Sequence, residues 1–190
     1  MFKKVLIPLI TGNEEIETVT IYSILSRAGN KVLLSKCPEI NKADNNLNVK
    51  LSRGLTIRAN RELSYNMKNK FDLIVLPGGL LGAKNYNKCE MIKKILNYRK
   101  KENLLYGAIC ATPGVFLAKN NLLNYSATCF PSFKNNLTEH GYKYENKPIV
   151  QDGNIITGRG AGDAITFSLK LVKILNGKNI YNNVKKSLLL

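Results

Sequence analysis

Cys110 is the residue whose surroundings most strongly indicate chemistry. It lies in "YGAICATPGVF" (106–116), between a short apolar run and a Thr-Pro-Gly sequence that is typical of a helix start. A cysteine at a sharp strand-to-helix turn can be held as a nucleophile. The positive end of the following helix would also favour the thiolate over the thiol. The alternative is an unreactive core residue, which is the commoner role of a buried cysteine.

Two further segments offer groups that could act with this thiol. In "GNEEIET" (12–18), Glu14 and Glu17 share one face of a predicted helix, while Glu15 points elsewhere. A carboxyl group buried beside a thiolate would keep its proton and could donate it. The alternative is that these acidic residues only stabilise a helix N-terminus. In "LPGG", Gly78 and Gly79 would let the backbone approach a ligand closely, or would only form a tight turn.

Each of these segments follows a predicted β-strand. The apolar runs at 3–10, 71–77 and 103–109 are typical of strands that are buried on both faces. A helix over 14–28 and a strand over 31–35 complete a βαβ unit, which predicts a parallel sheet. Ligands of such sheets bind beyond the carboxyl ends of the strands. We therefore expect the three segments to meet there.

The remainder of the chain continues this alternation, with no repeats. We predict one domain over residues 1–190, an α/β fold with a doubly wound, mostly parallel sheet and helices on both faces, as in flavodoxin. The other expected elements are an Asn-rich loop (39–48), two short strands (47–59) around a turn at 52–54, helices at 90–101 and 111–121, a hairpin (147–158) with its turn at Asp152-Gly153, and a long amphipathic helix from 161 that stops at Gly177.

Composition excludes several classes of protein. The formal charge is +16, yet the lysines are spread along the chain among many asparagines, which favours a solvated basic surface over a nucleic-acid-binding face. An RNA-associated scaffold is therefore the weakest alternative. Four cysteines stand far apart with no C-x-x-C pair, so we expect free thiols in a reducing compartment. With no apolar run of about 20 residues and no signal peptide, we expect a cytoplasmic protein that does not bind membranes.

Four motifs together resemble the ThiJ/PfpI superfamily, and most closely its DJ-one branch of parkinsonism-associated deglycase and redox-sensor proteins. They are "GNEEIET", "LPGGLLGA", "GAICATPG" and "TGRGAGDAITFSL", in this order and spacing, and the resemblance covers roughly residues 3–188. It implies that Cys110 is the nucleophile and that Glu17 is the glutamic acid bonded to it. It also implies that the oxyanion hole is formed by the backbone N–H groups of Gly79 and Ala111.

The resemblance extends to other residues. Glu14 matches a pocket-lining carboxylate, and we expect Gly78 and Arg53 to line the same pocket. Arg27 and Arg159 also fall where family members place arginines.

This sequence departs from the family pattern at two positions. Phe130 stands where the family often has a histidine, so a general base is missing, and Thr112 replaces a glycine, which would narrow the space beside Cys110. The only histidine, His140, lies in a polar stretch and is expected at the surface. Proteolysis is therefore not expected, because general acid-base groups contribute about 10²–10⁴-fold to such reactions.

Addition of a thiolate to an aldehyde needs no leaving group, so the remaining residues can suffice. We expect a cysteine-dependent, glutathione-independent glyoxalase or deglycase that acts on methylglyoxal, glyoxal and their early adducts. The alternative is an oxidative-stress sensor or redox-regulated chaperone, in which Cys110 becomes a sulfinate.

The family resemblance also implies a homodimer. We expect no cofactor and no metal. Gly160 and Gly162 could form an anion-binding loop, but a packed strand-to-helix turn is the favoured interpretation.

Overall fold

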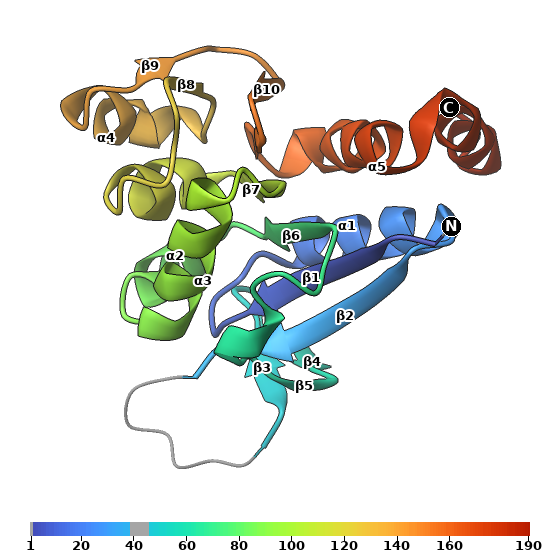
Figure 1. Cartoon of the computed structure of the whole chain (residues 1–190), viewed down its shortest axis with the longest axis horizontal. Coiled ribbons are helices and arrows are strands. Elements are labelled where there is room, and N and C mark those ends of the chain that lie inside the picture. The colour runs from blue at the N-terminus through green and yellow to red at the C-terminus, as the bar shows by residue number, and fades with distance from the viewer. Residues whose placement is uncertain (1, 39–45) are drawn as a thin grey trace.

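The computed structural model describes residues 2–38 and 46–190, so the loop predicted over 39–48 falls largely outside the described residues. A central sheet has the strand order β10-β11-β7-β6-β1-β2-β5 (Figure 1). Its strands pair in parallel except for β10 with β11. The strands of this sheet are β1 (Lys4–Leu9), β2 (Lys31–Lys36), β5 (Arg61–Glu62), β6 (Leu73–Leu76), β7 (Tyr106–Ile109), β10 (Ile149–Asp152) and β11 (Ile155–Gly158).

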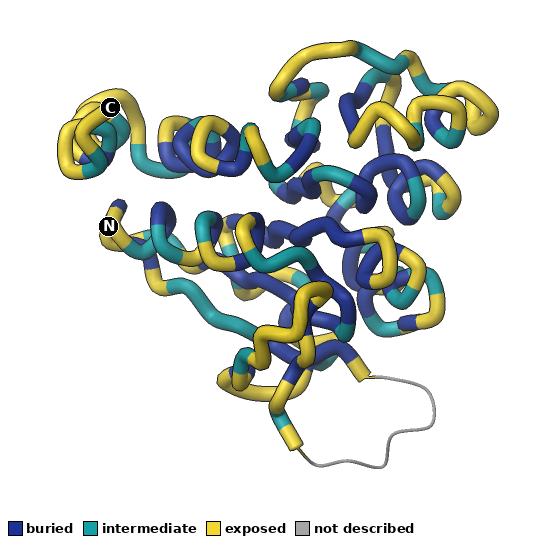
Figure 2. Tube along the Cα trace, turned by 180° about the vertical axis from the view of Figure 1, so that it is seen from behind, coloured by how far each residue is buried: buried dark blue, intermediate teal, exposed yellow. Residues whose placement is uncertain are grey.

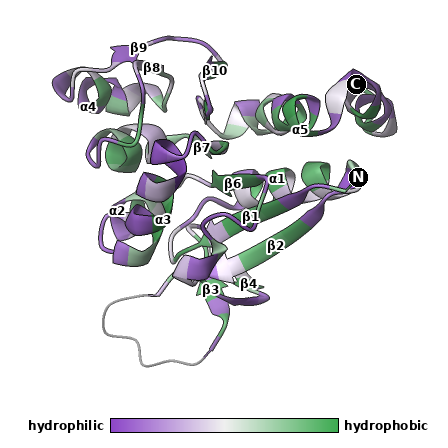
Figure 3. Ribbon diagram, viewed as in Figure 1, coloured by the Kyte–Doolittle hydropathy of each residue, from purple (hydrophilic) through white to green (hydrophobic). Residues whose placement is uncertain are grey.

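Both faces of the sheet are buried, which explains the continuous apolar runs. Along β1, Leu6 packs into one hydrophobic cluster while Val5 and Ile7 pack into the other. Successive side chains of a strand point to opposite faces, so only a strand covered on both sides needs apolar residues at every position. Figure 2 shows this buried centre inside half-exposed helices, and Figure 3 shows the strands β1, β2 and β6 as largely hydrophobic.

Helices cover both faces of the central sheet. α1 and α5 pack on one face with Val5 and Ile7, whereas α3, η1 and η2 pack on the other with Leu6. The helical segments are α1 (Glu15–Arg27), η1 (Tyr65–Met67), α2 (Leu80–Tyr86), α3 (Glu90–Lys101), the π-helix η2 (Pro113–Ala118), η3 (Pro131–Phe133), α4 (Lys134–Glu139), η4 (Ala161–Asp163) and α5 (Ala164–Ser187).

The predicted α/β fold is confirmed, including the βαβ unit and the hairpin of β10 and β11. The two short strands expected over 47–59 are β3 (Asn48–Lys50) and β4 (Thr56–Arg58), which form a separate antiparallel pair. β8 (Ser126–Ala127) and β9 (Lys143–Tyr144), which the sequence did not predict, form another pair. The predicted stop of the C-terminal helix at Gly177 is confirmed, since the backbone there is non-helical with φ of 82°, and a further helical segment that the sequence did not predict follows to Ser187.

The sheet positions the site through its strand order. The chain runs from β1 outward to β2 and β5 and then returns to β6 on the other side of β1. Ligands of such sheets bind at this reversal, beyond the carboxyl ends of the strands. The loops after β1, β6 and β7 therefore meet at one edge. Within the described part of the chain, no helix is long and apolar enough to cross a membrane.

Candidate active site

Cys110 directly follows β7, in a left-handed backbone conformation with φ of 67°. This conformation is costly for a residue other than glycine, and such strain is typical of functional sites. Two hydrogen bonds hold it: the Cys110 N–H donates to the Gly158 carbonyl at 3.0 Å, and the Phe130 N–H donates to the Cys110 carbonyl at 2.8 Å. The thiol is half-buried. Cys110 thus occupies a sharp turn of the kind that the sequence predicted.

Glu17 reaches the same place from α1 and is completely buried. Its Oε2 accepts a hydrogen bond from the Gly78 N–H at 2.7 Å. A Cβ atom added to Gly78 would lie 2.5 Å from that Oε2 and 2.5 Å from Cys110 Cβ. Both side chains therefore meet over a position that only glycine can occupy.

The Cys110 and Glu17 side chains lie close enough for each to affect the pKa of the other. Oε1 of Glu17 is nevertheless buried without a partner of good hydrogen-bond geometry among the described residues. One oxygen of the carboxyl group is thus anchored, and the other remains available to a group bound beside the thiol.

The electrostatics of this pair agree with the sequence-based expectation for Glu17 and oppose it for Cys110. Burial raises the pKa of Glu17 to about 7, against the lowering effect of its hydrogen bonds to Cys110 and Gly78. Burial also raises the pKa of the Cys110 thiol to about 12, and the charge of Glu17 contributes further. At neutral pH these shifts favour a thiol beside a carboxylate, and the predicted thiolate stays a prediction. Desolvation and a neighbouring negative charge outweigh the helix end.

Gly79 and Ala111 present their backbone N–H groups to the sulfur of Cys110. Hydrogen bonds from both groups lower the pKa of the thiol, although less than burial raises it. Gly79 has φ of 88°, and a Cβ atom there would lie 2.3 Å from the Gly12 carbonyl oxygen. Two donors beside a nucleophile are the arrangement that an oxyanion hole requires.

Glu14 and Arg53 lie near the site but are engaged elsewhere. Glu14 is the N-cap of α1, and its Oε2 accepts the Glu17 N–H at 2.8 Å. This is the helix-stabilising role that the sequence left open as an alternative. Arg53 lies in the exposed turn between β3 and β4, where its backbone N–H donates to the Glu15 carboxylate. A pocket-lining role for Glu14 and Arg53 stays a prediction.

The other two arginines of the family pattern lie apart from the thiol. Arg27 is at the far end of α1, about 15 Å along the helix from Glu17. Arg159 is paired with Asp163 at 2.9 Å.

The two departures from the family pattern have different consequences. Phe130 is bonded to Cys110 through its backbone, but its ring is 45% exposed and packs near Phe133, with ring centroids 6.1 Å apart. It supplies no base. Thr112 is buried and donates from Oγ1 to the Pro77 carbonyl at 2.7 Å, so its hydroxyl ties the turn after β6 to the nucleophile turn. His140 is exposed, as expected.

Asn13 is a site residue that the sequence analysis missed. It is completely buried, accepts the Ile10 N–H at Oδ1 and donates from Nδ2 to the Gly78 carbonyl at 3.0 Å. Tyr86 OH also donates to its Oδ1, at 3.1 Å. Asn13 thus joins the loop after β1 to the loop after β6. Its position after Gly12 at the end of a strand could have indicated this role, because asparagine side chains readily form hydrogen bonds with nearby backbone groups.

Comparison with known proteins places this geometry in a family. Residues 3–174 match the model of the DJ-1/PfpI family. The chain is 36% identical to protein dj-1beta of Drosophila melanogaster over 100% of its own length and 98% of that protein. The crystal structure of that Drosophila protein superposes with a TM-score of 0.91, covering 100% of this chain and 99% of that one.

One further relative is named by its activity, and another is much longer than this chain. The chain is 35% identical to glutathione-independent glyoxalase DJR-1.2 of Caenorhabditis elegans, over 93% of this chain and 90% of that protein. It is 36% identical to protein DJ-1 homolog B of Arabidopsis thaliana, but it spans only 38% of the length of that relative. The fold, the strained cysteine turn and these matches agree, and the chain belongs to the DJ-1/PfpI family.

Proposed function

We propose that the protein is a glutathione-independent glyoxalase that converts methylglyoxal to lactate and glyoxal to glycolate. The observation that carries the proposal is the fully buried Glu17 carboxyl group against the thiol of Cys110 in its strained turn. Relatives named as glutathione-independent glyoxalases in Caenorhabditis elegans and Schizosaccharomyces pombe, 35% and 37% identical, support it. The same site would act as a deglycase on early glyoxal adducts of amines.

The resting thiol and carboxylate determine how the reaction would begin. Glu17 accepts the thiol proton while the sulfur of Cys110 bonds to the aldehyde carbon. The N–H groups of Gly79 and Ala111 stabilise the oxygen as it becomes negative. Protonation of that oxygen gives a hemithioacetal.

Glu17 then moves a proton between the two carbons of the substrate. Its carboxylate removes the hydrogen on the carbon bonded to sulfur and returns a proton to the neighbouring carbon, which leaves a thioester on Cys110. Water cleaves the thioester to lactate and the free thiol, so methylglyoxal and one water give lactate. A single carboxyl group with a pKa near 7 suits both directions of transfer.

Turnover of methylglyoxal by purified variants tests the proposal. Cys110→Ala and Glu17→Ala should each reduce lactate formation to the uncatalysed rate, whereas the matched control Cys89→Ala removes a buried thiol elsewhere and should retain turnover. In the wild type, kcat/KM should rise as pH increases through about 7, because Glu17 must be ionised to accept the thiol proton. Undiminished turnover in either site variant refutes the proposal.

A redox sensor is the second candidate, and the unpartnered Oε1 of Glu17 favours it. Two molecules of peroxide would oxidise the thiol to a sulfinate and yield two waters, and a protonated Glu17 could bond a sulfinate oxygen. A Toxoplasma gondii relative of 30% identity and TM-score 0.87 has been solved as an oxidized protein. Mass spectrometry after mild peroxide would support this candidate if Cys110 gains two oxygens and aldehyde turnover is negligible.

We also propose that the protein is a homodimer. Ile16, Val19 and Tyr22 expose 57%, 47% and 40% of their surface at a spacing that puts them along one side of α1. A second copy is the occupant that the family resemblance implies. Sedimentation of the wild type should give a dimer and Val19→Lys a monomer; a monomeric wild type would disprove it.

A further inference from the structure

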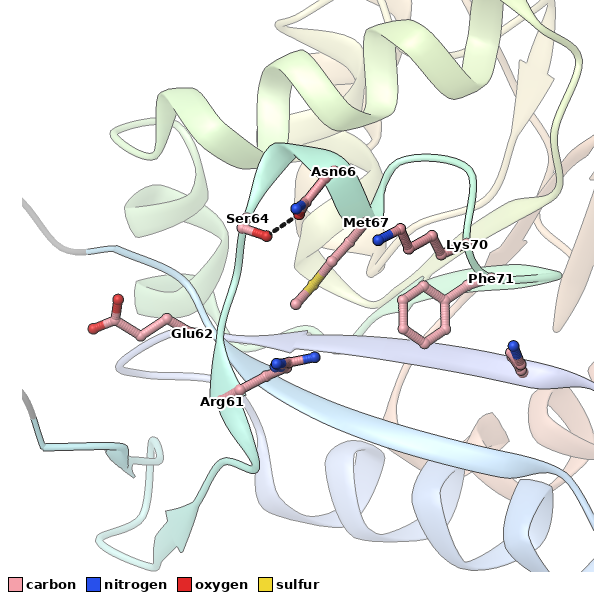
Figure 4. Close-up of a pocket in the computed structure, with 8 residues that line it drawn as sticks. Arg61, Glu62, Ser64, Asn66, Met67, Lys70 and Phe71 are labelled. Carbon is pink, nitrogen blue, oxygen red and sulfur yellow. Dashed lines mark hydrogen bonds between the residues drawn. The ribbon is translucent and has the colours of Figure 1, made fainter.

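A second concave site lies apart from Cys110. It has a volume of about 610 Å³ and is lined by residues from the start of β1, from β5, from η1 and from the turn that leads into β6 (Figure 4). None of the residues that surround the Cys110 thiol lines it. The proposed glyoxalase reaction therefore leaves this cavity without a role.

The described residues that line the cavity carry a net positive charge. Lys4, Arg61 and Lys70 line it, and none of these three side chains forms an ion pair within the part of the chain that is described. Among the described residues that line the cavity, Glu62 is the only acidic one, and Figure 4 shows its carboxylate pointing away from Arg61, Lys70 and Phe71. Cations that share a cavity repel one another unless an anion joins them.

The neutral polar groups add donors to this site. The Ser64 hydroxyl donates to Oδ1 of Asn66, so the acceptor atom of that amide is occupied and its Nδ2 donors remain. Arginine and lysine side chains are donors only. The lining thus offers many donors and few acceptors, which is the complement of a phosphate group with its several acceptor oxygens.

The base of the cavity is apolar and held in place. Met67 is 5% exposed, and Phe71 packs against the hydrophobic core. The buried guanidinium of Arg99 donates to the backbone carbonyls of Lys68 and Phe71 at 2.9 and 3.1 Å. This fixes the segment that carries Lys70 and Phe71. An aromatic ring beside cations can receive a flat group while the cations bind its phosphate.

We propose that this cavity binds a phosphorylated small molecule with a flat ring system, of the nucleoside monophosphate class. The phosphate lies among Arg61, Lys70 and Lys4, and the ring system lies against Phe71. Binding here requires neither Cys110 nor Glu17, so it is independent of the proposed glyoxalase activity.

Calorimetric titration of the full chain with AMP, adenosine and inorganic phosphate tests the proposal. AMP should bind saturably with one site per chain. Adenosine lacks the phosphate and inorganic phosphate lacks the ring, so each should bind at least about tenfold more weakly than AMP. Salt should weaken the AMP affinity because the contacts are charged.

Substitutions in the cavity locate the binding. Arg61→Gln with Lys70→Gln should weaken AMP by about tenfold or more, and each single change by about threefold. The matched control, Lys178→Gln with Lys186→Gln, removes the same charge from exposed positions of α5 and should leave the affinity unchanged. Phe71→Leu should weaken AMP by about fivefold and leave inorganic phosphate unaffected. Methylglyoxal turnover should stay at the wild-type level in the Arg61 and Lys70 variants.

Three results would overturn the proposal. The first is the absence of saturable AMP binding. The second is an equal loss of affinity in the control pair, which would mean that the general positive charge of the protein attracts anions. The third is a protein that does not bind AMP but binds single-stranded RNA, with an affinity that increases with the length of the RNA and does not change when Arg61 and Lys70 are substituted. This result would indicate a dispersed nucleic-acid surface instead.

Discussion

Two cysteines of this protein lie at or shortly before the start of a helix but differ in their acidity. Cys110 precedes η2, and burial with the charge of Glu17 raises the pKa of its thiol to about 12. Cys89 is the N-cap of α3, where a hydrogen bond from Cys37 and the N–H groups of Met91 and Ile92 lower the pKa of its thiol to about 7. A helix N-terminus is common to both. The acidity of each thiol therefore depends on its burial together with its neighbouring side chain, Glu17 for Cys110 and Cys37 for Cys89.

The comparison of Cys89 with Cys110 shows that the reactivity of a thiol does not follow from its pKa alone. Cys89 is almost completely buried, so an ionised thiol there has little access to a substrate. Cys110 is more exposed and keeps its proton, but it has a carboxylate that can accept that proton during the reaction. The chemistry of the site thus depends on a buried carboxylate beside the sulfur, whereas Glu90, the carboxylate that acts on Cys89, is exposed and paired with Lys93.

Adding a side chain to Gly78, which lies between Cys110 and Glu17, should have the largest effect on turnover. Gly78→Ala places a Cβ atom 2.5 Å from both Cys110 Cβ and Glu17 Oε2, so one side chain must move. We expect methylglyoxal turnover to fall by about 10² or more, since misplaced catalytic groups cost this much. The control Gly162→Ala meets no atom within 4 Å and should keep turnover. Equal rates in the two variants would mean that the pair tolerates displacement.

Removing the buried charge should alter stability in one pH range only. The pKa of Glu17 is raised from 4.5 to about 7 in the folded protein, so the folded state holds the proton more tightly and loses stability as pH rises between these values. Glu17→Gln keeps the shape without the charge and should stabilise the protein by up to about 3 kcal/mol at pH 8. The gain should vanish below pH 4.5. Denaturant unfolding at both pH values measures it, and a gain that is independent of pH would contradict the burial argument.

The same substitution should make the thiol of Cys110 more acidic. The charge of Glu17 and its hydrogen bond both raise the pKa of the thiol, so Glu17→Gln removes two of the causes. We expect iodoacetamide to alkylate Cys110 about tenfold faster at pH 8, because the thiolate is the nucleophile. Peptide mapping distinguishes it from Cys89, whose rate should not change. An unchanged rate at Cys110 would show that burial alone sets its pKa.

The smallest effect is expected at the two neighbouring thiols of Cys37 and Cys89. Cys37→Ala removes the leading cause of the lowered pKa of Cys89, so the ionisation of Cys89 should shift to higher pH. Titration of thiolate absorbance, with Cys89→Ala to identify the step, measures this shift. Methylglyoxal turnover should be unaffected. A step near pH 7 that persists in Cys37→Ala would assign the acidity to the N–H groups of α3 instead.

Sequence reasoning could bring Cys110, Glu17 and Gly78 together, because each follows a strand of one parallel sheet and such ends meet at one edge. It could not give the direction of the Cys110 pKa shift, since desolvation and like charge depend on distances that spacing does not contain. The pairing of Cys37 with Cys89 was missed for the same reason. α2 was missed because it is short, and its Gly82 reads as a helix breaker although it allows close packing on Asn13.

The left-handed backbone conformation at Cys110 lowers the stability of the fold, whereas the proposed chemistry requires the sulfur of this residue. Glycine would relax this turn at little steric cost, so the replacement that best suits the backbone is one that abolishes the sulfur. A population evolving for thermal robustness alone would be expected to discard the thiol at this position. Retention of cysteine there in an evolving laboratory population would reveal how strongly its reactivity is selected.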